Sequence, residues 1–322
     1  MPLQIIKSDI TKIQCDAIVN AANSSLLGGG GVDGMIHQAA GSELLKECEK
    51  LGGCETGQVK VTAGYNLPCK YIIHAVGPIW KGGNYQEEQL LRSCYKNSLE
   101  TATKYNCETI AFPLISSGIY GYPKEEALAI AIDEISKYLF SHEIFVYLVI
   151  FDKNSFVINR KLKHDIEEFI TKKYLYNYIN NSRKTESNCF SFVTIEPSDL
   201  QDINNILNNR DESFCEMLFR IIDEKGLKDS DVYKKANIDR RLFFKIRSNT
   251  DYAPSKYTAV ALAIALELNL DETNVFLKSA GFALSNSNNF DMIIKYLIKE
   301  GEYDINRINA VLFDYDQKTL GG

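Results

Sequence analysis

The sequence predicts an α/β domain followed by an all-α domain. In residues 1–175, short apolar runs bounded by polar or turn residues alternate with longer amphipathic stretches, an order typical of a sheet covered by helices on both faces. From Ser213 onward, almost every segment has helical periodicity. Residues 177–188 are rich in Asn and Ser with little periodicity, which indicates a linker. We therefore expect domains at 1–176 and 211–322, joined by a linker at 177–210.

The first domain contains four strand-like and four helix-like segments. Each strand-like run is short and apolar, and each helix-like run repeats its apolar residues at spacings of three and four. Connections of this kind predict a sheet that is covered on both faces. The expected strands are 16–20, 71–75, 109–112 and 145–151, and the expected helices are 33–48, 87–104, 124–140 and 160–173.

Composition excludes some classes of function. Hydrophobic residues make up 45% of the 322 residues, enough for two cores. The longest apolar run is Ile144–Phe151, far short of the roughly 20 residues that a membrane span needs. Residues 1–12 lack the charged segment followed by an apolar stretch that is typical of a signal peptide. We therefore expect no signal peptide, no membrane partner and a cytoplasmic location. The net charge of −6 gives no general attraction to nucleic acid, which would need a local basic patch.

The eight cysteines are scattered along the chain. None forms a Cys-x-x-Cys pair, and none is grouped with His at the spacing of a zinc site. We expect free thiols, no metal site and no cofactor. The cysteines are Cys15, Cys48, Cys54, Cys69, Cys94, Cys107, Cys189 and Cys215.

A glycine-rich loop carries the strongest functional signal. A buried strand runs into Asn20 and Asn23, the four glycines 28–31 follow, and a helix begins near Asp33. Glycines allow backbone N–H groups to approach a ligand closely, and a helix start favours an anion. The alternative is a flexible turn. The loop lacks the Lys-Ser/Thr ending of a Walker A motif, so it is not that type of nucleotide site.

Asp33 and His37 lie four residues apart, on one face of the expected helix. An Asp in a first helical turn is usually a capping residue. It becomes a candidate general base if phosphates bind beside it. Both interpretations stay open from spacing alone.

A second glycine loop makes phosphate binding a concrete hypothesis. Residues 112–123 follow a strand and precede a helix, and they contain Ser116, Ser117, Gly118 and Gly121. Two such loops, each between a strand and a helix, can hold a diphosphate from both sides.

Several motifs in order resemble macrodomains of the MacroD type. They are Val19–Asn23 with the first glycine loop, 31–37, 71–78 and 115–123, and Asp9–Thr11 resembles the family's adenine-contacting segment. The resemblance covers about the first 173 residues. It implies a mixed central sheet with helices on both faces, and it implies binding of ADP-ribose or of an ADP-ribosylated target. It also implies a hydrolase that cleaves ester-linked mono-ADP-ribose or deacetylates O-acetyl-ADP-ribose without a cofactor.

The resemblance implies roles for the loop residues. Asp33 would orient or deprotonate the attacking water, and Asn23 and His37 would complete the catalytic group. Asn20 and Asn23 would approach the distal ribose. For His37, support of the distal ribose and a purely structural role both stay open. The diphosphate would be held by Gly30, Gly31, Val32, Ser117, Gly118, Ile119 and Tyr120.

At the other end, the resemblance implies that Asp9 and the backbone of Ile10 read the adenine. Phe151, just after the last expected strand, would stack near the adenine or lie in the core. Ser8 stands where the family usually has Gly, which affects adenine recognition only mildly because Ser is small. We expect His74, inside an apolar strand, to be a hydrogen-bonded core histidine.

Two other functions stay open. The domain could be a reader that binds ADP-ribose without turnover, although such readers often lack the Asp found here at position 33. It could also be a sensor whose second domain acts as a regulator.

The second domain contains a pattern that resembles the lambda-repressor-like helix–turn–helix family over about 60 residues. Residues 227–247 predict a short helix, a turn at 237–238 and a second helix capped by Asp239. The second helix would contact duplex DNA. The domain has more acidic than basic residues, and Asp231 stands where the family often has Gln, so a protein-binding or dimerisation module is the alternative. The expected DNA-contacting residues are Arg240, Arg241, Phe244 and Lys245.

Overall fold

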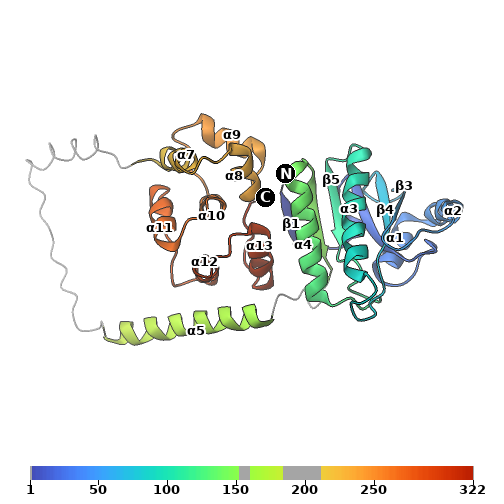
Figure 1. Ribbon diagram of the computed structural model, residues 1–322, viewed down its shortest axis with the longest axis horizontal. Helices are drawn as coiled ribbons and strands as arrows, with labels where there is room; N and C mark the ends of the chain where they lie inside the picture. Colours follow the sequence, from blue (N-terminus) through green and yellow to red (C-terminus); the bar gives the residue numbers. More distant parts are fainter. Residues whose placement is uncertain (1, 152–159, 184–211, 322) are drawn as a thin grey trace, which may run out of the picture. The chain divides into compact units, whose positions relative to one another are not determined.

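The computed structural model describes residues 2–151, 160–183 and 212–321 (Figure 1). Contacts divide the chain into two compact units, each with its own buried core. The first comprises Met1–Arg160 with Asn237–Asp239 and Asp304–Gly322, and the second comprises Lys161–Ala236 with Arg240–Tyr303.

The first unit contains a six-stranded sheet in the order β1-β6-β5-β2-β4-β3. All neighbours are parallel except β3, which runs antiparallel to β4, so the sheet is mixed. The four strands expected from the sequence are present, and the edge strands β1 and β3 were not expected. The strands are β1 Leu3–Lys7, β2 Ala17–Ala22, β3 Val59–Ala63, β4 Tyr71–Val76, β5 Thr109–Pro113 and β6 Phe145–Ile150.

Helices cover both faces of this sheet. On one face, α1 (Gly31–Ala40) and α2 (Ser42–Leu51) bury apolar side chains in a cluster with Ile18 and Ile72. On the other, α3 (Glu87–Lys104) places Tyr95 against Phe112 of β5, with ring centroids 5.4 Å apart, and contacts α4 (Lys124–Ser141). Side chains alternate between faces along a strand, and because helices cover both faces, the four central strands β2, β4, β5 and β6 are mostly apolar.

The single helix expected over 33–48 is wrong, because the chain forms two helices that meet at Gly41. This residue has φ of +92°, a conformation that favours glycine. A Cβ there would also fall 2.8 Å from the side-chain nitrogen of Asn66. The break turns α2 away from the axis of α1, while both keep their apolar faces on the sheet.

The topology brings the two glycine loops to one edge of the sheet. The first loop follows β2, the second follows β5, and β2 and β5 are parallel neighbours. Ligands of parallel sheets commonly bind at the carboxyl ends of the strands. The fold therefore places a cavity where the sequence predicted a diphosphate site.

Among its described residues, the second unit contains helices joined by turns and no strand. Its central helix α10 (Lys256–Ala265) is buried over Ala259–Ala265 and forms the middle of the core. The helix α5 (Arg160–Arg183) belongs to this unit because Phe169 packs on Tyr296, with centroids 5.4 Å apart. The other helices are α7 Phe214–Glu224, α8 Asp229–Lys235, α9 Arg240–Ser248, α11 Leu270–Ser279 and α12 Asn289–Lys299, while α13 Ile305–Asp314 is grouped with the first unit.

The expected boundaries differ from this division. The first unit separates at residue 160, not 176, since α5 packs in the helical unit. Residues 177–183 of the expected linker continue α5, and 184–210 lie outside the described residues. Among the described helices, none has both the length and the apolarity that crossing a membrane requires.

We predict that Tyr95→Phe destabilises the first unit by about 1–3 kcal/mol, the cost of leaving a buried backbone group unpaired. Tyr95 is fully buried, and its hydroxyl accepts the backbone N–H of Ile115 at 3.1 Å, at the start of the second glycine loop. Chemical denaturation of the wild type and of each variant measures the free energy of unfolding. The control, Tyr65→Phe, removes a hydroxyl that binds Glu47 at the surface, and we expect a change below about 1 kcal/mol. An equal loss of stability in Tyr95→Phe and Tyr65→Phe would contradict a stabilising role for the hydrogen bond between Tyr95 and Ile115.

Candidate functional site

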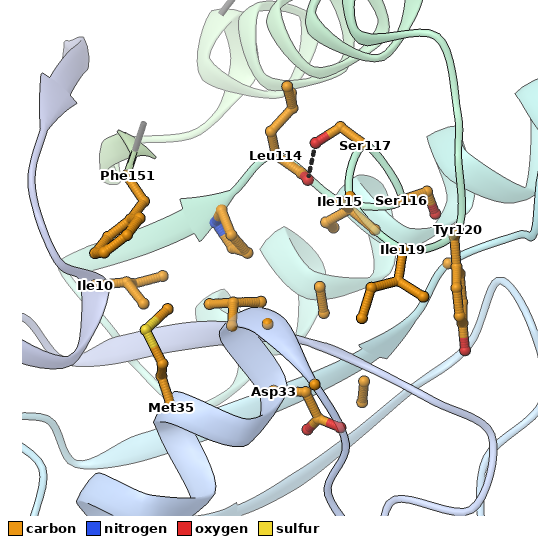
Figure 2. Close-up of a pocket in the computed structure, with 18 of the residues that line it drawn as sticks. Ile10, Asp33, Met35, Leu114, Ile115, Ser116, Ser117, Ile119, Tyr120 and Phe151 are labelled. Atoms are coloured by element: carbon orange, nitrogen blue, oxygen red, sulfur yellow. Dashed lines mark hydrogen bonds between the residues drawn. The ribbon is translucent and has the colours of Figure 1, made fainter. Parts of the chain in front are cut away.

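A cavity of about 710 Å³ lies between the two glycine loops (Figure 2). The start of α1 forms one wall, the loop after β5 forms another, and the end of β6 closes a third. Most residues predicted as ligand-binding line it, whereas Asp9, Asn20 and His37 do not. The predicted residues that line it are Ile10, Asn23, Gly30, Gly31, Val32, Asp33, Ser117, Gly118, Ile119, Tyr120 and Phe151.

Some residues of the lining were not predicted from the sequence. Met35 reaches the cavity from the second turn of α1, and Gly77 does so just after β4. A Cβ on Gly77 would fall 2.1 Å from the hydroxyl oxygen of Ser116, so only glycine allows this segment to approach the second loop. The glycine itself was the available signal, because it follows a buried strand in the motif 71–78.

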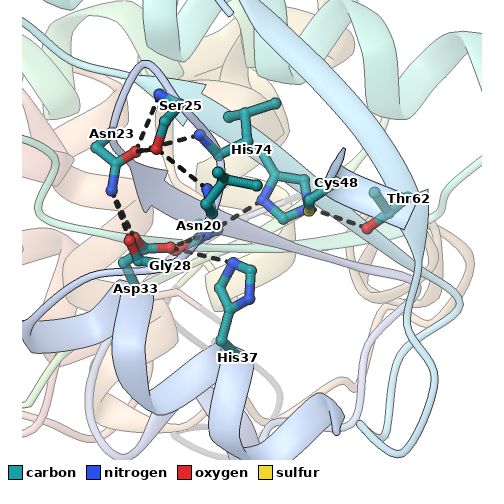
Figure 3. A network of polar contacts seen from close by, with 11 residues as sticks. Asn20, Asn23, Ser25, Gly28, Asp33, His37, Cys48, Thr62 and His74 are labelled. Carbon is teal, nitrogen blue, oxygen red and sulfur yellow. Dashed lines mark hydrogen bonds and ion pairs between the residues drawn. The ribbon is translucent and has the colours of Figure 1, made fainter. Parts of the chain in front are cut away.

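Asn23 shapes the first loop. Its side-chain oxygen accepts the backbone N–H groups of Ser25 and Leu26, at 3.0 and 3.1 Å. Its amide nitrogen donates to the carbonyl of Gly28 at 2.7 Å and lies 3.4 Å from Oδ2 of Asp33 (Figure 3). Asn23 therefore holds the loop in place and also lines the cavity.

Asp33 is held in the first turn of α1 with only 3% of its surface exposed. Its Oδ1 accepts a hydrogen bond from Asn20 Nδ2 at 2.7 Å. Burial raises the pKa of Asp33, while the Asn20 hydrogen bond and the charge of His37 lower it, and the net shift is upward. A carboxylate with a raised pKa beside a cavity is suited to accept a proton.

His37 lies behind Asp33. Its Nε2 is 3.5 Å from Oδ1 of Asp33 and makes no hydrogen bond with any described residue. Asn20 is fully buried, does not line the cavity and hydrogen-bonds Asp33, which does. The structure thus brings the predicted residues together, but it places Asn20 and His37 as neighbours of the carboxylate.

Both loops that line the cavity contain backbone N–H groups without a partner in the described chain. In the described part of the chain, the N–H groups of Ser117 to Tyr120 make no hydrogen bond. The helix α1 begins after Gly30 without a side-chain cap, so its first N–H groups are unpaired as well. A Cβ on Gly30 would lie 3.0 Å from Cδ1 of Ile119, which shows how closely the loops approach. Two sets of N–H donors on facing loops suit a diphosphate.

The far end of the cavity is apolar. Ile10 and Phe151 line it, and the Phe151 side chain is 63% exposed, which excludes a core position for its ring (Figure 2). Asp9 caps a 3₁₀ turn, η1 (Ile10–Lys12), by accepting Thr11 N–H at 3.0 Å. Hydrogen bonds from Thr11 lower the pKa of Asp9. The turn positions Ile10 at the cavity.

The fold also assembles three potential metal ligands that the sequence did not group. Ligand atoms of His37, Cys48 and His74 lie within 4.8 Å of one another. Both ring nitrogens of His74, however, already have hydrogen-bond partners, Asn20 at 3.1 Å and Thr62 at 2.9 Å. Burial raises the pKa of the Cys48 thiol to about 11, which disfavours the thiolate that metals need. The three groups do not fit a metal site: His74 and Cys48 lie in a network of polar contacts, and His37 faces Asp33.

In the helical unit, the four residues predicted to contact DNA share one exposed face of α9. Phe243 and Ile246 are buried on the opposite face. The Arg240 guanidinium lies 5.3 Å from the centre of the Phe244 ring. The exposed residues are Arg240, Arg241, Phe244 and Lys245.

The family model and the sequence relatives that match the first unit are all macro domain proteins. The Macro domain family matches residues 19–131, which include both glycine loops. A macro domain-containing protein of Methanosarcina mazei is 56% identical over 155 residues, which cover 48% of this chain and 83% of that protein. The ADP-ribose glycohydrolase MACROD2 of Xenopus laevis is 52% identical over 167 residues, which cover 52% of this chain and 40% of that protein.

Among solved structures, the Oceanobacillus iheyensis macrodomain with ADP is 46% identical, with a TM-score of 0.48, and the match covers 52% of this chain and 92% of that one. The first unit of the present chain contains the mixed sheet, the two glycine loops and the buried Asp33 described above. Given these features and the identity to the M. mazei protein over most of its length, this chain belongs to the macrodomain family.

Proposed function

We propose that this protein binds ADP-ribose and hydrolyses the ester that links it to a target or to an acetyl group. The observation that carries the proposal is the buried Asp33 carboxylate, with a raised pKa, beside two loops of unpaired N–H groups. Identity to MACROD2, an ADP-ribose glycohydrolase, supports hydrolysis. Adenine would lie between Ile10 and Phe151, the diphosphate on the loops, and the distal ribose near Asp33.

The chemistry needs one water molecule and no cofactor. The water attacks the electrophilic carbon of the ester while Asp33, aided by a ligand phosphate oxygen, holds it and accepts its proton. The bond between that carbon and the departing oxygen breaks, and the oxygen takes up the proton. The products are ADP-ribose and a free carboxylic acid. N–H groups aimed at the diphosphate hold the ligand without rearrangement.

A reader of ADP-ribose is the second function compatible with this cavity. It would use the same loops but would not need a buried carboxylate with a raised pKa. Burying a carboxylate costs free energy, so its presence at the cavity favours hydrolysis.

We predict that Gly118→Glu abolishes ADP-ribose binding. Gly118 lines the cavity, and a Cβ there meets no atom within 4 Å, so the new side chain extends into open space near the diphosphate. Gly118→Gln has the same size without the charge, and we expect it to bind at least about tenfold more tightly than the Glu variant. Calorimetry measures both affinities. Wild-type affinity in a folded Glu variant would place the diphosphate elsewhere.

We predict that Asp33→Ala and Asp33→Asn reduce ester hydrolysis by roughly 10²-fold or more, the effect of removing a general base. Affinity for ADP-ribose should persist, since the loops hold the ligand. In the wild type, kcat/KM should fall as the pH falls through the raised pKa of Asp33, because the protonated acid cannot accept a proton, and the midpoint should lie above 3.8. Rates at several pH values, measured with glutamate-linked ADP-ribose, test this. Absence of wild-type turnover would favour the reader.

For the helical unit, we propose that the exposed face of α9 binds duplex DNA, because three basic side chains and an aromatic ring share it. We predict salt-sensitive binding, since contacts to phosphates release counterions. Arg241→Ala should weaken it and relax any sequence preference. The control, Lys278→Ala, removes an exposed charge from α11 and should change little. Fluorescence anisotropy of the full chain at two salt concentrations measures this, and no binding at micromolar protein would favour a protein-interaction module.

A further inference from the structure

A chain of hydrogen bonds runs from the edge strand of the sheet to Asp33 (Figure 3). Thr62 of β3 lies 2.9 Å from Nε2 of His74 in β4. Nδ1 of His74 lies 3.1 Å from Nδ2 of Asn20 in β2, and the same nitrogen donates to Asp33 at 2.7 Å. Four residues from three strands and a helix are therefore linked in series.

The chain has a single allowed direction. A carboxylate can only accept, so the Asn20 atom that faces Asp33 must be the amide nitrogen. The same nitrogen then donates to Nδ1 of His74, and this places the imidazole proton on Nε2, where it is donated to Thr62. The Thr62 hydroxyl donates in turn to the carbonyl of Ala63 at 3.3 Å. The tautomer of His74 is thus fixed from both ends.

The network is shielded from water. Asn20 and His74 are fully buried, Thr62 is 2% exposed, and Asn20 pairs with His74 in the parallel register of β2 and β4. Burial, followed by the charge of His37, lowers the pKa of His74 to about 3, so the ring is neutral across the physiological range. The neutral imidazole has one acceptor nitrogen, Nδ1, and this nitrogen accepts the hydrogen bond from the Asn20 amide.

The side-chain oxygen of Asn20 is buried without a hydrogen-bond partner among the described residues. The orientation of this amide therefore depends on its two N–H contacts, to Asp33 and to His74. Without an acceptor at Nδ1 of His74, the amide could rotate and bring its oxygen beside the carboxylate of Asp33. Two acceptors facing each other in a buried site repel.

We propose that His74 and Thr62 are positioning residues for the hydrolysis, acting on Asp33 through Asn20. The inference rests on the proposed function and deepens it. His74 holds the Asn20 amide in the orientation that donates to Asp33, and Thr62 holds His74 in the tautomer that accepts from Asn20. Neither residue lines the cavity, so neither contacts the ligand.

Other groups also act on the carboxylate, and the test must keep them constant. His37, on α1 like Asp33, has its Nε2 3.5 Å from Oδ1 of Asp33. Asn23, in the first loop, has its Nδ2 3.4 Å from Oδ2 of Asp33. Burial raises the pKa of Tyr120, in the second loop, and of Cys48, in α2, and the charge of Asp33 adds to both shifts. A substitution at Thr62 leaves all four side chains in place.

The experiment compares Thr62→Val with Thr62→Ser in the full chain. Valine has nearly the shape of threonine but no hydroxyl, whereas serine retains it. We expect Thr62→Val to lower kcat about tenfold, in line with the loss of one buried hydrogen bond, with KM and ADP-ribose affinity within about twofold of wild type. The acid limb of its rate profile should move to higher pH, because the hydrogen bond from Asn20 lowers the pKa of Asp33. Thr62→Ser should stay within about twofold of wild type in kcat and keep the wild-type profile.

Two measurements do not depend on turnover. Nitrogen-15 NMR of the wild-type imidazole should show His74 protonated at Nε2 and not at Nδ1. Carbon-13 NMR titration of the Asp33 carboxyl should give a higher pKa in Thr62→Val than in wild type or Thr62→Ser. If wild type hydrolyses no ester, the proposed function fails, while these spectra still decide the positioning network.

Three outcomes would overturn the inference. One is an unchanged acid limb and an unchanged Asp33 titration in a folded Thr62→Val protein. Another is a His74 proton on Nδ1 in wild type. The third is an equal loss of kcat in Thr62→Val and Thr62→Ser, or a loss of ADP-ribose affinity in Thr62→Val as large as its loss of kcat. Either result would indicate a general packing defect.

Discussion

The carboxylate of Asp33 is kept out of water at the first turn of α1, and the surrounding structure provides what such burial requires. An ionised group in this position needs hydrogen bonds and a favourable local dipole. Asn20 supplies a donor at 2.7 Å, and the helix start supplies the dipole. The chain also passes very close to the carboxylate, since a Cβ on Gly29 would lie 3.1 Å from its Oδ2. Sheet, loop and helix meet at this one group.

The second loop completes the arrangement from a neighbouring strand. Because β5 pairs with β2 in parallel, the two loops emerge side by side, and hydrogen bonds from Asn23 and to Tyr95 then hold them. The missing side chain at Gly30 lets the first loop approach Ile119 of the second, and the missing side chain at Gly77, after β4, lets that segment approach Ser116. The cavity is therefore a consequence of strand order combined with the absence of side chains at a few positions.

Much of this unit could be predicted from the sequence, because its central strands are apolar runs and its loops carry glycines. The edge strand β3 was harder to identify, since Val59–Ala63 includes Lys60 and is only partly buried. The division of the first helix at Gly41 depends on a contact with Asn66, which no local pattern indicates. His74 was correctly predicted to be a hydrogen-bonded core residue, but its partners lie 12 and 54 residues away. Strand pairing, which spacing along the chain does not encode, brings them together.

The chemistry of the cavity wall has a consequence for selectivity inside a cell. Among the described residues that line it there is neither Lys nor Arg, so its attraction for phosphate comes from short-range N–H dipoles. Such dipoles act only on a group that fits between the loops, whereas a cationic pocket attracts any polyanion at a distance. Polyanions that lack an adenine and diphosphate of matching shape would therefore compete poorly for this cavity. The net charge of −6 repels all phosphates alike, so any preference for one ligand would come from its fit between the loops.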